Sequence, residues 1–304
     1  MSAAMFGLLK VHRRLSTSAS PVQGWKRLIR FIGEDGSIYQ GEPILSENGL
    51  KSIDDLKAKL IKGNIFDNTA KVTDSIVPIR KLLSPISTSQ VPLIRCIGLN
   101  YKKHALETNQ SIPKYPILFI KPSTAVQDPF EPVRLPKIAA NHVDYEAELA
   151  VVIKKECKNV DKEKALEYVL GYTAGNDISA REWQKTRGGG QWSFSKGFDT
   201  FSPLGPMLVS PTVITNPNSL RISMTVNDVK MQDSNTGDMV FDVASLISFL
   251  SQSTTLQPGT VILTGTPEGV GFVKDPPVYL QTGDKMTVEI ENIGQLTNYV
   301  ENEK

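Results

Sequence analysis

The stretch Asp144-Tyr145-Glu146-Ala147-Glu148-Leu149-Ala150-Val151-Val152-Ile153 places Glu146 and Glu148 at the head of an apolar run. The apolar and β-branched residues at its end predict a long, buried strand. Because side chains alternate along a strand, Glu146 and Glu148 share one face and Ala147 and Leu149 share the other. Two adjacent carboxylates repel each other unless a cation lies between them. A single Glu-x-Glu pair is also typical of a solvated strand face, so the pair alone leaves both interpretations open.

A third acid, Asp177, closes the segment Ala174-Gly175-Asn176-Asp177 at the end of another predicted strand. Three carboxylates with room left for water suit a hard octahedral cation such as Mg²⁺ or Mn²⁺. The three histidines and two cysteines of the chain form no zinc ligand set. Spacing alone therefore leaves a metal site at Glu146, Glu148 and Asp177, or a group of solvated acids, equally open.

Cationic residues gather around the same stretches of sequence. Lys121 ends a predicted apolar strand, where a desolvated ammonium either has a lowered pKa or pairs with a substrate carboxylate. Arg181 and Gln184 follow Asp177 at helical spacing and share one face. Lys196 follows an aromatic stretch. Each of these cations is also compatible with an ordinary surface position, which is the commonest one for Lys and Arg.

Two further segments offer groups for acid–base chemistry and anion binding. His104 and Glu107 are three residues apart, so their side chains would meet on a helix. A carboxylate-supported imidazole is a general base, although an exposed ion pair would look the same in sequence. The glycine-rich segment 264–271 lacks the ending of a phosphate-binding loop and predicts no nucleotide site. Its backbone amides and the Thr266 hydroxyl suit a carboxylate instead.

The composition excludes several classes of protein. The chain has 304 residues, a length typical of about two domains. Apolar residues make up 40% and charged residues 22%, which rules out a disordered or fibrous protein. The net charge is +2 and no basic run stands out, so we expect no nucleic-acid partner. No window approaches the ~18 consecutive apolar residues of a membrane span. Two cysteines are too few for a disulfide scaffold, and Cys96 is expected to be a buried, reduced thiol.

The N-terminal segment has its own character. No acidic residue precedes Glu34, whereas Lys10, Arg13 and Arg14 lie opposite an apolar arc if the segment is helical. A basic, Ser-rich, acid-free amphipathic segment is typical of a mitochondrial transit peptide. We therefore expect residues 1–23 to direct the protein to the mitochondrial matrix. A tail without an address is the alternative.

The remaining chain divides into a small N-terminal α+β domain, 24–88, and a catalytic domain, 89–304. Alternation predicts a β-hairpin within 25–44, and apolar spacing predicts a helix over 52–63. A Ser- and Pro-rich connection over 76–90 marks the boundary. The other expected strands are 93–97, 117–120, 146–153, 220–226, 229–231, 261–263, 285–290 and 295–300. Helices are expected over 161–171 and 241–250, and a further one is expected to start near 179. Because strands and helices do not alternate regularly, the fold class is α+β and sheet-rich.

Six segments together resemble signatures of the fumarylacetoacetate hydrolase superfamily, and they occur in family order over about residues 93–300. They are 98–101 with His104 and Glu107, 119–122, 144–149, 176–181, 196–200 and 262–267. The N-terminal domain and the segments 179–184 and 199–206 resemble the mitochondrial domain-containing subgroup, which includes oxaloacetate tautomerases. Close relatives of that subgroup are acylpyruvate hydrolases and oxaloacetate decarboxylases.

The resemblance implies a mixed β-sandwich roll as the catalytic domain, and a homodimer. It implies Mg²⁺, with Mn²⁺ as a substitute, on Glu146, Glu148 and Asp177, and a small 2-oxo acid as the substrate. The residues that it places around the substrate are Lys121, Arg181, Gln184, Lys196 and Thr266. These activities share an opening step in which a metal stabilises the enolate of a bound 2-oxo acid.

Three outcomes branch from that shared step. Reprotonation gives tautomerisation, loss of CO₂ gives decarboxylation, and attack of water on a second carbonyl gives hydrolysis. Our first interpretation is keto-enol tautomerisation of oxaloacetate in mitochondria, with Lys121 or Lys196 moving the proton. Hydrolysis of acylpyruvates, with His104 and Glu107 activating water, and decarboxylation of oxaloacetate are the alternatives. A binding or scaffold protein would be expected to lose some of the acids or cations, and none is lost.

Overall fold

The strand that carries Glu148 lies at the centre of the molecule. The structure is a computed structural model that describes residues 24–45, 56–67 and 69–304. Strand β10 (Ala147–Ile153) is buried along its whole length, as predicted. It pairs antiparallel with β11 (Val169–Asn176) on one side and with β16 (Val261–Leu263) on the other. Apolar side chains on both faces are what such a central position requires.

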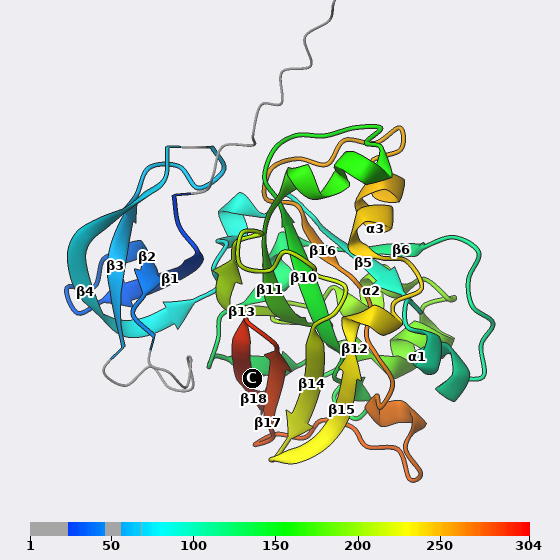
Figure 1. Cartoon of the computed structure of the whole chain (residues 1–304). Helices are drawn as coiled ribbons and strands as arrows, with labels where there is room; N and C mark the ends of the chain where they lie inside the picture. The colour runs from blue at the N-terminus through cyan, green and yellow to red at the C-terminus, as the bar shows by residue number, and fades with distance from the viewer. Residues whose placement is uncertain (1–23, 46–55, 68) are drawn as a thin grey trace, which may run out of the picture.

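The large sheet has eleven strands and runs through both predicted domains (Figure 1). Its order is β2 (Ile38–Pro43), β3 (Lys57–Lys62), β4 (Lys71–Leu83), β1 (Arg27–Gly33), β13 (Ser202–Val209), β11, β10, β16, β5 (Ile94–Gly98) and β6 (Ile117–Lys121), with β7 (Val126–Gln127) paired to β13. The N-terminal strands β1 to β4 form a lobe of their own at one end of this sheet. They join the rest through β1, where Leu28 pairs with Leu208 of β13.

A second sheet of five strands covers one face of the large sheet. Its order is β15 (Val229–Asn235), β14 (Arg221–Val226), β17 (Lys285–Ile290), β18 (Gly294–Asn302) and β8 (Pro132–Leu135). It contacts β10, β11 and β13. Leu149 and Val151 of β10 belong to the core shared by the two sheets, whereas Ala150 and Val152 belong to a second core on the opposite face. The predicted α+β, sheet-rich fold is therefore confirmed, and so is the alternation of β10.

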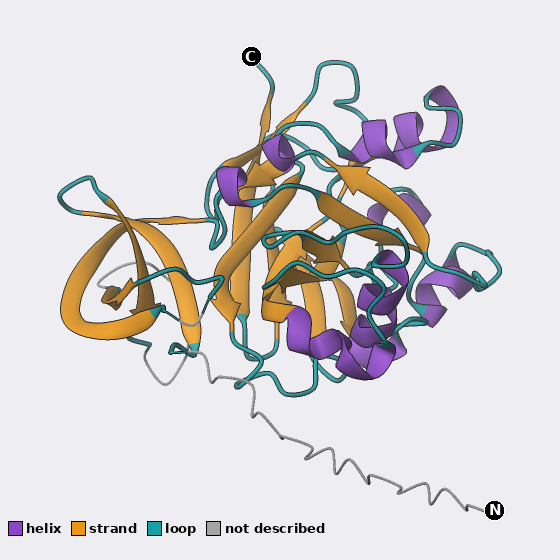
Figure 2. Ribbon diagram, turned by 90° about the horizontal axis from the view of Figure 1, so that it is seen from above, coloured by secondary structure: helices purple, strands orange, loops and turns teal. Residues whose placement is uncertain are grey.

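Short helices and a two-stranded ribbon complete the fold, and most of the helices lie away from the N-terminal lobe (Figure 2). The α-helices are α1 (Lys102–Glu107), α2 (Trp192–Lys196) and α3 (Val243–Leu250). The ribbon joins β9 (Val143–Asp144) to β12 (Ser179–Ala180). The other short helices are η1 (Thr88–Gln90), η2 (Ser123–Ala125), η3 (Lys162–Tyr168), η4 (Trp183–Arg187), η5 (Thr236–Asp238) and η6 (Gly271–Val273). In the described chain no helix has the length and apolar character needed to cross a bilayer.

The N-terminal lobe departs from the prediction in one element. The hairpin of β1 and β2 is confirmed, but the helix predicted over 52–63 is wrong for 57–62, which form β3. Residues 52–55 of that prediction lie outside the described residues. The pairing of β3 with β4 shifts register between Lys59 and Ile61. This bulge breaks the two-residue alternation and gives the apolar positions a spacing that mimics a helix.

The predicted connection over 76–90 also begins later than expected, because β4 continues to Leu83. Strand β4 pairs with β3 as far as Pro78 and with β1 from Ile79 onward. The proline therefore falls where the strand changes partners, a position that tolerates its missing N–H. The helix expected near Ser179 instead starts after β12, and the helix expected over 161–171 ends at Tyr168, because β11 begins at Val169.

Candidate active site

The three acids predicted as metal ligands meet at one end of β10 and β11. The antiparallel register sets Ala147 opposite Asn176, and the Asp177 N–H donates to the Glu146 carbonyl at 2.9 Å. One carboxylate oxygen from each of Glu146, Glu148 and Asp177 lies within 4.8 Å of the others. None of the three is more than 5% exposed. The predicted acidic cluster is therefore confirmed, and a solvated strand face is excluded.

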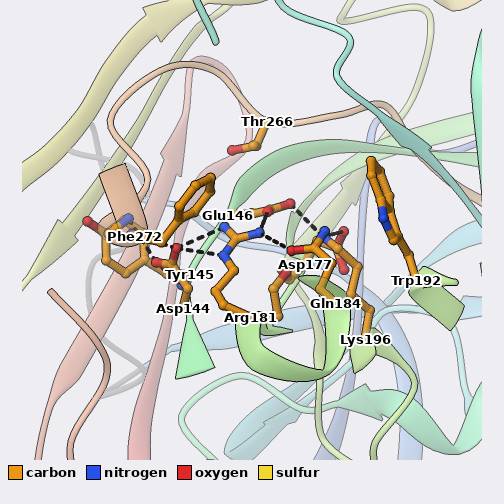
Figure 3. A network of polar contacts seen from close by, with 12 residues as sticks. Asp144, Tyr145, Glu146, Asp177, Arg181, Gln184, Trp192, Lys196, Thr266 and Phe272 are labelled. Atoms are coloured by element: carbon orange, nitrogen blue, oxygen red, sulfur yellow. Dashed lines mark hydrogen bonds and ion pairs between the residues drawn. The ribbon is translucent and has the colours of Figure 1, made fainter. Parts of the chain in front are cut away.

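Two buried lysines bind these acids. Lys196, in α2, donates from Nζ to Glu146 Oε2 at 2.8 Å and to Asp177 Oδ2 at 2.6 Å (Figure 3). Lys121, at the end of β6, donates to Asp177 Oδ1 at 2.7 Å and to the carbonyl of Phe201. Lys196 keeps its positive charge in this buried position. Burial alone would lower its pKa, but Asp177 and Glu146 more than offset this and raise it.

Arg181 contacts two of the buried acids and two further side chains. Its Nη1 lies 2.7 Å from Glu146 Oε1, while Nε and Nη2 lie 2.9 and 2.8 Å from Asp144 Oδ2. Nη1 also donates to Gln184 Oε1 at 2.9 Å, and the guanidinium lies over the Phe272 ring. Only 3% of Arg181 is exposed. Arg181 and Gln184, which were expected at the substrate, both line the cleft described below, and Arg181 also binds Asp144 and Glu146.

Asp144 is a member of the site whose role the sequence motif did not reveal. Its Oδ1 accepts from the N–H groups of Tyr145 and Gly271, and its Oδ2 accepts from the N–H of Phe272. Asp144 therefore joins Arg181 to the backbone around Gly271. The available signal was its position two residues ahead of Glu146, the same spacing that links the two glutamates.

The cations of the site are bound to Glu146, Asp177 and Asp144, and Glu148 differs from these acids. Its Oε2 accepts the Gly265 N–H at 2.7 Å, and it has no ion-pair partner in the described chain. Burial, together with repulsion from Asp177 and Glu146, raises its pKa well above the ordinary value. In contrast, burial opposes ionisation of Glu146, but Lys196 and Arg181 outweigh it and lower the pKa to about 2.

Four buried acids face three buried cations at this point. They are Asp144, Glu146, Glu148 and Asp177 against Lys121, Arg181 and Lys196. With all four acids ionised, one negative charge is left over beside a donor set made entirely of carboxylate oxygens, which fits a divalent cation such as Mg²⁺ or Mn²⁺. The residues present therefore fit the metal that the sequence resemblance implies.

A cleft of about 310 Å³ opens onto the acids. Among its lining residues are Glu146, Arg181, Gln184, Lys196, His104 and Thr266 at the polar side, and Phe119, Trp192 and Phe272 as aromatic walls. Gly98 also lines it, and a Cβ there would lie 2.0 Å from the Trp192 ring, so this wall requires glycine. Lys121 does not line the cleft; it lies behind Asp177 and positions that acid.

His104 and Glu107 meet on α1, as predicted. His104 Nδ1 lies 2.7 Å from Glu107 Oε1, and the imidazole is 7% exposed where it lines the cleft. Glu107 Oε2 accepts the Gly269 N–H at 2.9 Å, so the pair is tied to the glycine-rich segment 264–271. The alternative of an exposed ion pair is excluded for His104, and the geometry is that of an oriented imidazole.

Thr266 lies at the cleft with its hydroxyl oriented by a residue that sequence reasoning missed. Thr266 Oγ1 accepts from Gln232 Nε2 at 2.8 Å. Gln232, on β15, also donates to the Pro267 carbonyl and accepts the Ala147 N–H. It therefore ties the five-stranded sheet to the acidic strand. No signal in the sequence marks this glutamine, because the contact forms only when the two sheets come together.

Fold and site together define an α+β enzyme whose cleft ends at a buried carboxylate cluster. The family model described as "Fumarylacetoacetate (FAA) hydrolase C-terminal" matches residues 93–301. The chain belongs to this family of enzymes. The match contains α1, β6, β10, β11 and α2, which supply or directly adjoin the three acids, the two buried lysines and the His104–Glu107 pair.

Several relatives extend this finding. The mitochondrial oxaloacetate tautomerase fahd2 of Xenopus laevis is 47% identical over 219 residues, covering 72% of this chain and 68% of that protein. The caffeoylpyruvate hydrolase of Neonothopanus nambi is 42% identical over 92% of this chain and 94% of that protein. Among solved structures, the 2-hydroxyhepta-2,4-diene-1,7-dioate isomerase of Mycobacterium marinum superposes with a TM-score of 0.77 at 37% identity, covering 91% of this chain and 99% of that one.

Proposed function

We propose that this enzyme is a metal-dependent tautomerase that interconverts the enol and keto forms of oxaloacetate, with Mg²⁺ held by Glu146, Glu148 and Asp177. The observation that carries the proposal is the buried cluster of three acids, one of which, Glu146, lines the cleft. The name of the 47% identical Xenopus laevis relative supports this substrate and this reaction. Tautomerisation needs only a group that stabilises the enolate and a group that moves one proton at carbon.

Each residue of the site has a distinct part in this proposal. A divalent cation on the acids supplies a Lewis acid that binds the 2-oxo acid and stabilises its enolate. Lys196 lines the cleft and keeps its charge, so it adds an ammonium beside the developing oxyanion. The Thr266 hydroxyl binds a carboxylate oxygen of the substrate. Lys121 holds Asp177 in place, and Arg181, which also lines the cleft, holds Glu146 in place.

A substrate panel with the purified protein and Mg²⁺ tests this reaction against its alternatives. Enol absorbance, pyruvate formation and acid release are followed together on oxaloacetate and on acylpyruvates. We expect rapid decay of the oxaloacetate enol without pyruvate or acid release. Pyruvate formation at the same rate would make decarboxylation the activity. Acid release from an acylpyruvate, with no effect on the oxaloacetate enol, would make the protein a hydrolase.

Hydrolysis of an acylpyruvate is the second candidate, because one specific arrangement favours it. Activation of water requires a positioned general base, and His104 against the cleft with Glu107 behind it supplies one. The caffeoylpyruvate hydrolase relative, which this chain matches over 92% of its length, supports the same interpretation. Both reactions begin from the same enolate, so the two candidates differ only in whether that enolate is reprotonated or its second carbonyl is attacked by water.

We also propose that the protein acts in the mitochondrial matrix as a homodimer. The mitochondrial name of the Xenopus laevis relative supports the location, together with the basic, acid-free segment 1–23.

The proposed dimer is supported by the outer edge of β6, which offers a surface where a second copy of the chain could pack. That strand ends the large sheet and exposes Ile117, Leu118 and Ile120 by 37–43%. Sedimentation analysis would give twice the chain mass if the proposal holds, and the chain mass if it fails.

A further inference from the structure

Three cations line the cleft in the described part of the chain, and only two of them have carboxylate partners. Arg181 is bound to Asp144 and Glu146, and Lys196 is bound to Glu146 and Asp177. The third, Lys185, lines the same cleft but forms no ion pair with any described residue. Lys185 is therefore the cation of this cleft whose charge no described carboxylate balances.

Lys185 is held against the wall of the cleft by an aromatic ring. It lies in η4, directly after Gln184, and its Nζ is 3.8 Å from the centroid of the Phe272 ring. A cation over a ring face is attracted by the ring's quadrupole while its N–H groups stay free to donate elsewhere. The N–H of Phe272 is bound to Asp144, so the ring that carries Lys185 is itself anchored in the site.

The position of Lys185 suits the far end of a short substrate. The Phe272 ring also carries the Arg181 guanidinium, 4.4 Å from its centroid, and Arg181 in turn contacts Glu146 at 2.7 Å. Lys185 is therefore one side chain removed from the acids, along the same wall. Partial burial and the charge of Arg181 lower the pKa of Lys185. An incoming carboxylate would offset both effects.

We propose that Lys185 is a specificity residue that binds a second carboxylate at the far end of the substrate, so that the enzyme selects dicarboxylic 2-oxo acids. This inference rests on the proposed function and deepens it. The 2-oxo acid end of the substrate lies toward the acidic cluster, and the distal carboxylate pairs with Lys185. Such a contact is the same before and during the reaction, so it lowers KM and leaves kcat unchanged.

The test compares two substrates that differ only in the distal charge. They are the enol of oxaloacetate and the enol of its monomethyl ester at the distal carboxylate. In Lys185→Met we expect KM for oxaloacetate to rise about tenfold, which corresponds to about 1.4 kcal/mol. The kcat and the KM for the ester stay unchanged, and Lys185→Arg restores most of the preference. Lys164→Met, an exposed lysine in η3, is the matched control for the loss of one positive charge.

A measurement on the wild type tests the same contact between Lys185 and the distal carboxylate without any substitution. Raising the salt concentration from about 0.05 to about 0.3 M should raise KM for oxaloacetate more than KM for the ester, because salt screens a partly exposed ion pair. Equal effects of Lys185→Met on both substrates, or no effect on either, would overturn the role of Lys185 while the tautomerase activity stands. A wild type that accelerates neither enol would overturn the proposed function, and this inference with it.

Discussion

The Nη1 atom of Arg181 lies 2.7 Å from Oε1 of Glu146, while the rest of the guanidinium is bound to Asp144. Glu146 is one of the three acids proposed to hold the metal, so this contact fixes a ligand and also keeps it ionised. Arg181 is charged at all working pH values, and its planar fork suits two carboxylates at once. The structure therefore makes Arg181 a positioning residue for the acidic cluster.

Replacing Arg181 tests that role. Arg181→Met would leave Asp144 and Glu146 buried without their partner, a change that typically costs about 3–5 kcal/mol of unfolding free energy. Arg187→Met is the matched control, because Arg187 forms an exposed pair with Glu182 in η4 and should cost at most about 1 kcal/mol. Urea denaturation of both variants measures the difference. Unchanged stability of Arg181→Met with a raised KM would instead make Arg181 a substrate anchor.

The raised pKa of Glu148 predicts how the metal-free protein responds to pH. The folded chain binds the Glu148 proton more tightly than the unfolded chain, whose pKa is near the ordinary 4.5. Stability contributed by this group is therefore lost as pH rises from about 4.5 toward the raised value. In urea denaturation without metal, the unfolding free energy of the wild type should fall across this window relative to Glu148→Gln. Parallel pH curves for the two proteins would contradict the raised pKa.

Much of the site could be predicted from the sequence, because its acids lie on two segments whose pairing the pattern determines. Glu146 and Glu148 alternate with apolar residues, and Asp177 ends the neighbouring strand. The parts that could not be predicted depend on contacts between distant elements. Gln232 reaches Thr266 from the second sheet, and Arg181 turns toward protein acids.

The difference between local sequence patterns and contacts between distant elements also explains the errors in the predicted fold. The core strands β10 and β5 were predicted because their sequences are dense in apolar residues, whereas the buried central strand β13 was not predicted. Strand β3 was missed because a bulge between Lys59 and Ile61 disguises its alternation, and only the pairing with β4 reveals it. Lys121 was expected at the substrate because it ends an apolar strand. Its sequence position does not show that Asp177 stands between it and the cleft.

Replacement of His104 distinguishes the tautomerase activity from the hydrolase activity. His104→Ala removes the base that would activate water, and general-base assistance is typically worth about 10²–10⁴-fold. We expect this variant to lose most of any acylpyruvate hydrolysis and to keep much of the oxaloacetate tautomerase rate, since tautomerisation needs no water nucleophile. Steady-state rates on both substrates give the comparison. A loss of both activities by the same large factor would place His104 in the shared enolisation step.

The N-terminal segment makes a prediction that concerns the cell and not the reaction. Deletion of residues 1–23 should leave folding and activity intact but abolish import into mitochondria, because the basic amphipathic pattern lies wholly within that segment. Full-length protein with Lys10, Arg13 and Arg14 changed to glutamate is the matched control and should also fail to be imported. Fractionation of cells that express tagged variants measures this. Truncated protein recovered in mitochondria would refute the proposed address.

The most direct test of the central claim is the initial rate of oxaloacetate enol decay, measured on metal-depleted protein as Mg²⁺ is added. We predict a negligible rate without metal and a saturable rise with Mg²⁺ in the wild type. Glu148→Gln, which lacks one anionic ligand, should need at least about 100-fold more Mg²⁺ for the same rate. Glu163→Gln, an exposed acid in η3, should match the wild type. A full rate without metal, or equal Mg²⁺ dependence in the wild type and Glu148→Gln, would contradict a metal-dependent tautomerase at this site.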